Sequence, residues 1–194
     1  MSAVLYDQLA TLLCYPNTAY PGAVESCCRA LAAAEPEIGV HVERFAAAVR
    51  GMRPPALEEL FTHTFDINPL SSLEVGWQLF GEQYERGTFL LRMRQEMRRL
   101  ALPESTELPD HLTHVLAVLG RMEPERADDF ATACVLPAVE RMCTALSSKE
   151  NPYEHALGAV KTFLVARHGA ALAQEGACAS ESGDKTSIAG TECP

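Results

Sequence analysis

The stretch 81-GEQYERGTFLLRMRQEM-97 places an arginine at the centre of what should be the apolar face of a helix. On a projection of 3.6 residues per turn, five apolar side chains lie within about 60° of Arg86. They are Phe89, Leu90, Met93, Met97 and Leu100. Such a face normally turns toward the core of a helical protein. The sequence therefore predicts a helix from residue 81 to about residue 102 that points a permanent cation at the protein interior.

A buried guanidinium needs a nearby carboxylate, because breaking a buried ion pair typically costs about 3–5 kcal/mol. Four acids are candidates for the partner: Glu82, one helical turn earlier, and Asp66, Glu107 and Asp110 from other segments. Gly87 has no side chain beside the arginine and is expected to let another backbone approach closely. Two compatible interpretations stay open. The arginine either joins several helices through a salt bridge or orders the wall of a cleft.

The other periodic segments are also helical, with apolar residues three and four positions apart and proline or glycine near their ends. They cover roughly residues 5–13, 21–31, 38–51, 54–65, 72–81, 109–119, 130–146 and 152–168. Pro137 is expected to interrupt or restart the helix that contains it. No window alternates apolar and polar residues with β-branched enrichment. We predict an all-α fold, a single-domain bundle of about nine helices over residues 1–168.

Residues 169–194 have a different composition, with almost no large apolar side chains and a net charge of −3. Such a segment cannot bury enough surface to offset the entropy lost on ordering, so a disordered acidic low-complexity tail is expected. The whole chain carries a net charge of −10. An acidic surface repels phosphate backbones and attracts basic partners, which argues against nucleic-acid binding.

Other general features indicate a cytoplasmic protein without stable membrane association. No apolar run approaches the ~18–20 residues that span a bilayer. The first residues lack the basic start and small-residue cleavage site of a secretory signal. The seven cysteines show no CxxC spacing, which favours free thiols over a zinc ribbon or a disulfide framework. A monomer is expected, and a domain-swapped dimer stays open.

A second motif is 107-ELPDHLTHVL-116, in which Pro109 and Asp110 fit the first turn of a helix. Together with 65-FDINPLSSLEVGWQLFGEQYERGTFL-90, it resembles the NarJ-type nitrate reductase delta-subunit chaperones, a branch of the TorD/DmsD superfamily of redox-enzyme maturation proteins. The shared pattern is a Phe-Asp pair, a helix with Ser-Leu, a glycine, an Arg-Gly pair and, further along, a Glu-Leu-Pro-Asp-His-Leu helix start. The resemblance covers roughly residues 5–165. The chain departs from it in being short and at 74-EVGW-77, which leaves the client enzyme open.

The resemblance implies an all-helical cytoplasmic chaperone that is not an enzyme and needs no cofactor. Its partner would be the catalytic subunit of a molybdenum oxidoreductase of the DMSO reductase family, whose N-terminal or twin-arginine signal peptide it holds while the cofactor is inserted. A basic, apolar peptide forms an amphipathic helix, so its receptor needs an apolar groove with acids at one end. Asp110 and His111 are the leading candidates, with Arg86 and Gly87 as the adjoining wall. The full set of candidate peptide-binding residues is Asp66, Leu73, Trp77, Phe80, Tyr84, Arg86, Gly87, Glu107, Asp110, His111 and His114.

Two alternative functions belong to other classes. An all-helical metal-dependent enzyme would need a cluster such as His63, Glu107, His111 and His114, but the HExxH and paired Glu-x-x-His spacings are missing, so no metal is expected. The phosphate-binding loop and the Gly-x-Ser-x-Gly elbow are also missing. A helical transcription regulator would use a basic face made of Arg92, Arg94, Arg98 and Arg99. Glu96 interrupts that face, and a solvated polar surface accounts for it better.

Overall fold

The computed structural model describes residues 3–147 and 150–181, with side chains as far as residue 169. Within these ranges the chain is helical and contains no strand. The elements are α1 (Ala3–Thr11), α2 (Tyr20–Ala34), α3 (Pro36–Val49), α4 (Pro54–Phe61), η1 (Thr62–Asp66), α5 (Val75–Phe80), α6 (Tyr84–Arg99), α7 (Leu112–Leu119), α8 (Pro124–Phe130), η2 (Ala131–Val135), α9 (Leu136–Leu146) and α10 (Tyr153–Glu181). Because η1 continues α4 and η2 joins α8 to α9, the described residues form nine continuous helical segments. The predicted all-α fold of about nine helices is confirmed.

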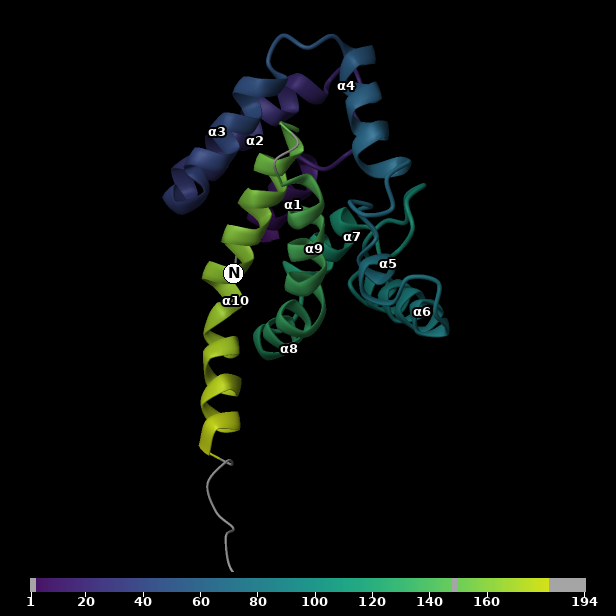
Figure 1. Cartoon of the computed structure of the whole chain (residues 1–194), viewed down its shortest axis with the longest axis vertical. Helices are drawn as coiled ribbons and strands as arrows, with labels where there is room; N and C mark the ends of the chain where they lie inside the picture. The colour runs from purple at the N-terminus through teal and green to yellow at the C-terminus, as the bar shows by residue number, and fades with distance from the viewer. Residues whose placement is uncertain (1–2, 148–149, 182–194) are drawn as a thin grey trace, which may run out of the picture.

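Helix α10 is the central element of the bundle. It packs against α3 on one side and α9 on another, while α2 pairs with α3 and α1 packs against α7. In Figure 1 the α2–α3 pair and the α5–α6 pair lie on opposite sides of α10 and α9. This arrangement leaves α5 and α6 at one edge of the molecule, where the predicted site residues are concentrated.

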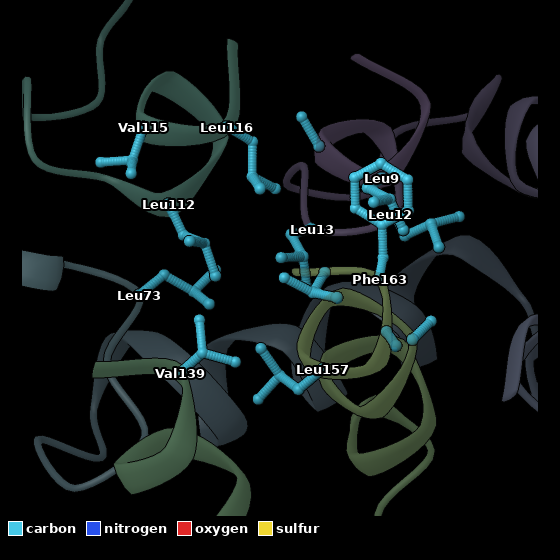
Figure 2. Close-up of a cluster of buried hydrophobic side chains, with 14 of the residues drawn as sticks. Leu9, Leu12, Leu13, Leu73, Leu112, Val115, Leu116, Val139, Leu157 and Phe163 are labelled. Carbon is cyan, nitrogen blue, oxygen red and sulfur yellow. The ribbon is translucent and has the colours of Figure 1, made fainter. Parts of the chain in front are cut away.

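The core consists mainly of leucine and valine side chains contributed by helices that are distant in sequence. Figure 2 shows Leu9 and Phe163 at one end of the labelled cluster and Leu73 and Leu112 at the other, with Leu157 between them. All five side chains are almost fully buried, with at most 2% of their surface exposed. Leu73 and Leu112 belong to the two motifs of the sequence analysis, so both motifs are anchored in the core.

Polar contacts reinforce the packing of α1 against the C-terminal half of the chain. The Tyr6 hydroxyl lies 2.8 Å from His168 Nε2, and His168 Nδ1 lies 2.6 Å from an Asp128 carboxylate oxygen. This chain of hydrogen bonds joins α1, α10 and α8. Arg121, just after α7, also donates two hydrogen bonds to the Asp7 carboxylate at 2.8 and 2.7 Å. Tyr6 and His168 are almost fully buried, so each needs the other as a partner.

The two π-helical turns let helices continue where an α-helix would stop. In η1 the Ile67 N–H bonds to the Thr62 carbonyl at 3.1 Å, and in η2 the Leu136 N–H bonds to the Ala131 carbonyl. Pro137 has no N–H to donate and would clash with the carbonyl four residues earlier in a regular α-helix. The α-helix restarts at the proline as expected, because α9 begins at Leu136 with Pro137 in its first turn. The wider π turn just before it keeps the helical segment continuous.

Helix α10 is described as far as Glu181, beyond the expected end of the last helix at residue 168. Its end contains the alanine-rich sequence 170-AALAQEGACAS-180, and alanine has the highest intrinsic helix propensity. The division of the chain into a bundle and a disordered tail from residue 169 stays a prediction. The rest of the predicted tail, 182–194, lies outside the described residues. Among the helices that the structure describes, none combines the length and the apolar character needed to cross a bilayer.

Candidate peptide-binding site

The two motifs of the sequence meet through backbone hydrogen bonds. The Val75 N–H donates to the Asp110 carbonyl at 2.9 Å, and the Leu112 N–H donates to the Leu73 carbonyl at 2.8 Å. These bonds form a short antiparallel bridge between the segment before α5 and the segment before α7. We name this contact the 74–111 bridge. It brings the Pro-Asp-His stretch against the helix that carries Trp77.

The bridge also changes where the seventh helix begins. Pro109 and Asp110 were expected in its first turn, with Asp110 complementing the helix dipole. In the structure α7 begins at Leu112 and His111 is its N-cap, in an extended conformation. The earlier start is excluded because the backbone of Asp110 and Leu112 is engaged with the other segment. The Asp110 side chain is thereby directed at α6 instead of the helix end.

Arg86 and Asp110 form the ion pair at the centre of this region. Arg86 Nε lies 3.6 Å from Asp110 Oδ2, a distance typical of an ion pair and longer than a normal hydrogen bond. The Asp110 side chain is fully buried, whereas 23% of the Arg86 side chain is exposed. Burial raises the pKa of the Asp110 carboxyl, and the Arg86 guanidinium offsets part of this effect. Of the four acids considered for Arg86, Asp110 is the one that contacts it.

Trp77 completes the surroundings of the guanidinium. The Arg86 guanidinium carbon lies 5.4 Å from the centroid of the Trp77 ring, which is a cation–π contact. The indole N–H donates to the Pro69 carbonyl at 2.9 Å. The arginine is therefore held between a carboxylate and an aromatic ring, and part of it still faces solvent.

The glycine that permits this close packing is Gly76, and the prediction for Gly87 was wrong. A Cβ at position 76 would come within 2.7 Å of Asp110 Oδ2 and 3.0 Å of Phe89 Cδ1. A Cβ at position 87 would meet nothing within 4 Å. Gly87 lies on the exposed side of α6, so the close approach to the Arg86–Asp110 pair comes from α5 and not from the residue beside the arginine.

His111 is a buried, neutral capping residue. Its Nδ1 lies 2.7 Å from the Thr113 hydroxyl and also accepts a long hydrogen bond from the Thr113 N–H. Burial, together with the neighbouring His114, lowers the pKa of His111 to about 4. At neutral pH the ring therefore carries no charge. Its described side-chain hydrogen bonds are to Thr113, so it acts on the start of α7 and not directly on a ligand.

His114 holds the loop that precedes the Pro-Asp-His stretch. Its Nδ1 donates to the Leu108 carbonyl at 2.9 Å, and its Nε2 lies 2.9 Å from the Ser105 hydroxyl. The ring centroids of His111 and His114 are 6.3 Å apart. The histidine pair is thus engaged in local hydrogen bonds at the start of α7.

An open groove shares Trp77 with the surroundings of the ion pair. It runs between α5 and α9 and has a volume of about 690 Å³. We name it the Trp77 groove; its apolar lining consists of Pro69, Leu70, Trp77, Leu79, Phe80 and Ala145. Leu70 is 66% exposed and contributes apolar surface to the groove. Gln78 and Arg141 support the groove, because Gln78 donates to the Leu70 carbonyl and Arg141 donates to the Gln78 carbonyl.

The predicted residues therefore fall into three groups. Leu73, Trp77, Arg86, Asp110 and His111 meet around the 74–111 bridge, with Phe80 in the adjoining groove and His114 behind it. Asp66, Tyr84, Gly87 and Glu107 are exposed, and no described contact joins them to the Arg86–Asp110 pair. Asp66 accepts a hydrogen bond from Thr62 in its own π turn. Three residues that shape this region were not predicted from the sequence as part of a site: Leu70, Gly76 and Arg141. None of the three had a signal in the sequence that marked it as part of a site, because the contacts that give each its role form only in the folded chain.

The residues considered for a metal site do not assemble. His63 is exposed, and its described ion-pair contact is Glu59, at 3.9 Å. Within residues 3–147 and 150–169, no three histidine, cysteine, aspartate or glutamate side chains are grouped closely enough to hold a metal ion. His111 and His114 are instead committed to the hydrogen bonds described above.

Fold and site together define an all-helical protein whose candidate site is an open apolar groove beside a buried ion pair. No protein-family model matches the chain. The chain is 36% identical over 75 residues to the probable nitrate reductase molybdenum cofactor assembly chaperone NarJ of Bacillus subtilis (strain 168). This match covers 38% of the chain and 41% of the relative, so the chain spans about two fifths of the relative's length. The resemblance to NarJ-type chaperones that the sequence motifs indicated is confirmed.

Proposed function

We propose that the chain is an assembly chaperone for a molybdenum oxidoreductase and that it binds the N-terminal or signal peptide of the catalytic subunit before assembly or export. The observation that carries the proposal is the similarity to a protein named as a nitrate reductase molybdenum cofactor assembly chaperone. The open groove beside Trp77 supports it, because a receptor for an apolar peptide needs such a surface. We assign this role to residues 1–168 and to the cytoplasm.

The Trp77 groove supplies the apolar half of the recognition. Its exposed Leu70 and half-buried Trp77 and Phe80 are side chains that gain free energy when a partner removes them from water. A volume of about 690 Å³ is within the range of binding pockets. A few leucine-sized anchors suffice for micromolar affinity, which corresponds to about −8 kcal/mol. Such affinity also permits release of the peptide when the client enzyme is complete.

The charged half of the recognition is proposed to come from the acids around the 74–111 bridge. The chain carries a net charge of −10, so basic peptides are attracted over a distance. Glu74 is one of the two bridged residues and Glu107 lies four residues before the other, and burial raises the pKa of Glu74. Arg86 has a different part in this scheme. Its partly exposed guanidinium stacks on the Trp77 ring, and we propose that it binds a carbonyl at the end of a bound helix.

Calorimetric titration with N-terminal peptides from candidate molybdenum-enzyme catalytic subunits tests this proposal. We expect micromolar binding by one peptide and a change in the fluorescence of Trp77, which is the single tryptophan. Leu70→Ser should weaken that binding about tenfold, because it removes one apolar anchor. Leu91→Ser is the matched control, since Leu91 is similarly exposed at 57% but does not line the Trp77 groove. The proposal fails if no catalytic-subunit peptide binds, or if both leucine variants behave alike.

A further inference from the structure

The outer face of α6 carries two large side chains that are exposed to solvent. Tyr84 is 88% exposed and Leu91 is 57% exposed. They are seven residues apart, so they lie on the same face of the helix. Gly87 and Thr88 lie between them, and a Cβ at position 87 would meet nothing within 4 Å. We name the surface formed by these four residues the Tyr84 face.

The position of α6 leaves this face open to another molecule. The helix packs against α5 and α7 with its other side, where Phe89, Met93 and Met97 are buried. In Figure 1 it lies at the edge of the molecule. A tyrosine and a leucine at such a position supply the apolar contact that a helix-to-helix interface needs.

Two opposite charges lie along one flank of the Tyr84 face. Glu85 and Arg92 are exposed and also seven residues apart, so they project in the same direction. Neither forms an ion pair with a residue that the structure describes. Apart from Arg94, the other charged residues of α6 have partners within the molecule: Arg86 with Asp110, Glu96 with Arg99 and Arg126, and Arg98 with Glu104. The free charges are therefore an acid in the first turn and bases further along.

We propose that the Tyr84 face binds the same face of a second copy of the chain, in an antiparallel two-fold dimer. A two-fold axis near Gly87 and Thr88 brings Tyr84 close to Leu91 of the second copy and Glu85 close to Arg92 of the second copy, because both pairs are nearly symmetric about that point. A parallel arrangement would instead bring like charges together. The glycine at the crossing point lets the two backbones approach closely.

The other free charges on α6 agree with this arrangement. Arg94 has no ion pair among the described residues, and neither has Glu82 in the turn before the helix. In the antiparallel dimer Arg94 faces the end of the second α6 that carries Glu82, so opposite charges meet again. No segment is exchanged between the copies, and the monomer expected from the sequence is the form present at low concentration. The inference does not rest on the proposed function.

Sedimentation equilibrium of the full chain tests for the dimer. A contact made by one helix face is smaller than the roughly 1,200 Å² of a stable interface, so we expect a dissociation constant of about 100 μM. Tyr84→Ser should weaken the dimer about tenfold, because it removes the largest exposed apolar group of the face. A chain that stays monomeric up to about 1 mM would leave this face to a different protein and overturn the proposal.

Charge reversal tests the antiparallel geometry. Glu85→Arg and Arg92→Glu should each weaken self-association about tenfold, because each replaces two attractions in the dimer with two repulsions. An equimolar mixture of the two variants should associate like the original protein, because every charge then meets its opposite. The doubly substituted chain, with both reversals, should also regain its self-association.

Glu43→Arg and Arg44→Glu are the matched controls. They change the net charge by the same amounts, and both residues are exposed on α3 without a described ion pair. They should leave the dissociation constant unchanged, and circular dichroism should show the same helix content in all variants. The proposal is overturned if a single reversal on α6 has no effect, if the mixture does not associate, or if the control reversals weaken the dimer equally.

Discussion

At the scale of single residues, the Arg86–Asp110 pair explains why an arginine occupies an apolar helix face. The guanidinium is only partly desolvated and has a buried carboxylate 3.6 Å away, so it avoids the full penalty of an isolated charge. The sequence indicated the pair, because a cation on an apolar face needs a counter-charge and Asp110 was one of four acids available. It did not indicate Gly76, because the need for a missing side chain arises only when α5 and the 74–111 bridge meet in space.

Gly76→Ala is expected to destabilise the protein by about 1–3 kcal/mol, the usual cost of adding a methyl group to a packed site. Its Cβ would lie 2.7 Å from Asp110 Oδ2, and that carboxylate cannot move without leaving Arg86. Gly87→Ala should instead stabilise the protein by up to about 1 kcal/mol, since alanine favours helix and its Cβ meets nothing. Urea denaturation of the two variants measures both changes. A larger loss at position 87 than at position 76 would contradict the packing described here.

His111 should make stability depend on pH below the ordinary histidine pKa. Burial lowers its pKa in the folded protein from 6.5 to about 4. Between these values the unfolded chain binds a proton that the folded chain does not, so stability falls as pH drops and the effect levels off near pH 4. The full contribution is about 3 kcal/mol.

His111→Asn removes this dependence and still caps α7, because asparagine is a good N-cap residue. Asp110 contributes a slope of opposite sign, since its folded pKa is raised, but it does so in both proteins. The difference between the two denaturation series from pH 7 to pH 4 therefore isolates the histidine. Parallel curves would show that His111 titrates normally.

At the scale of helices, the sequence located all nine continuous segments, because proline, glycine and apolar spacing are local signals. It did not locate their irregular parts. The π turn before Pro137 and the late start of α7 depend on contacts with other segments. The continuation of α10 to Glu181 was missed for another reason: the composition argument considered burial alone, whereas alanine-rich backbone is helical by propensity.

Tyr6→Phe should measure how firmly α1 is attached to α10. The change removes only the hydroxyl that pairs with His168 Nε2 at 2.8 Å and leaves the ring packed against Phe163. A buried ring nitrogen without its partner should cost about 1–2 kcal/mol in unfolding free energy. Tyr15→Phe is the control, because Tyr15 is 49% exposed and its hydroxyl makes no hydrogen bond with the described residues. Equal stabilities of the two variants would exclude a structural role for the Tyr6–His168–Asp128 contact.

At the scale of the whole molecule, the net charge of −10 should govern how quickly the proposed basic client peptide reaches the Trp77 groove. Added salt shortens the screening length from about 10 Å at 0.1 M to about 3 Å at 1 M, which weakens long-range attraction. Stopped-flow measurement of Trp77 fluorescence should show an association rate that falls with salt, while the dissociation rate changes little. A salt-independent association rate would mean that apolar contacts alone guide the encounter.

The 74–111 bridge has a consequence for the order of events during synthesis. The bridge joins the segment around Glu74 to the segment around His111, which follows much later in the chain. Two backbone hydrogen bonds hold the two segments together. Arg86 acquires its counter-ion only when the later of these segments has left the ribosome and docked. A nascent or half-folded copy therefore displays Trp77 without the Arg86–Asp110 pair, so a ligand captured at that stage would meet a tryptophan ring whose neighbouring arginine is not yet held in place.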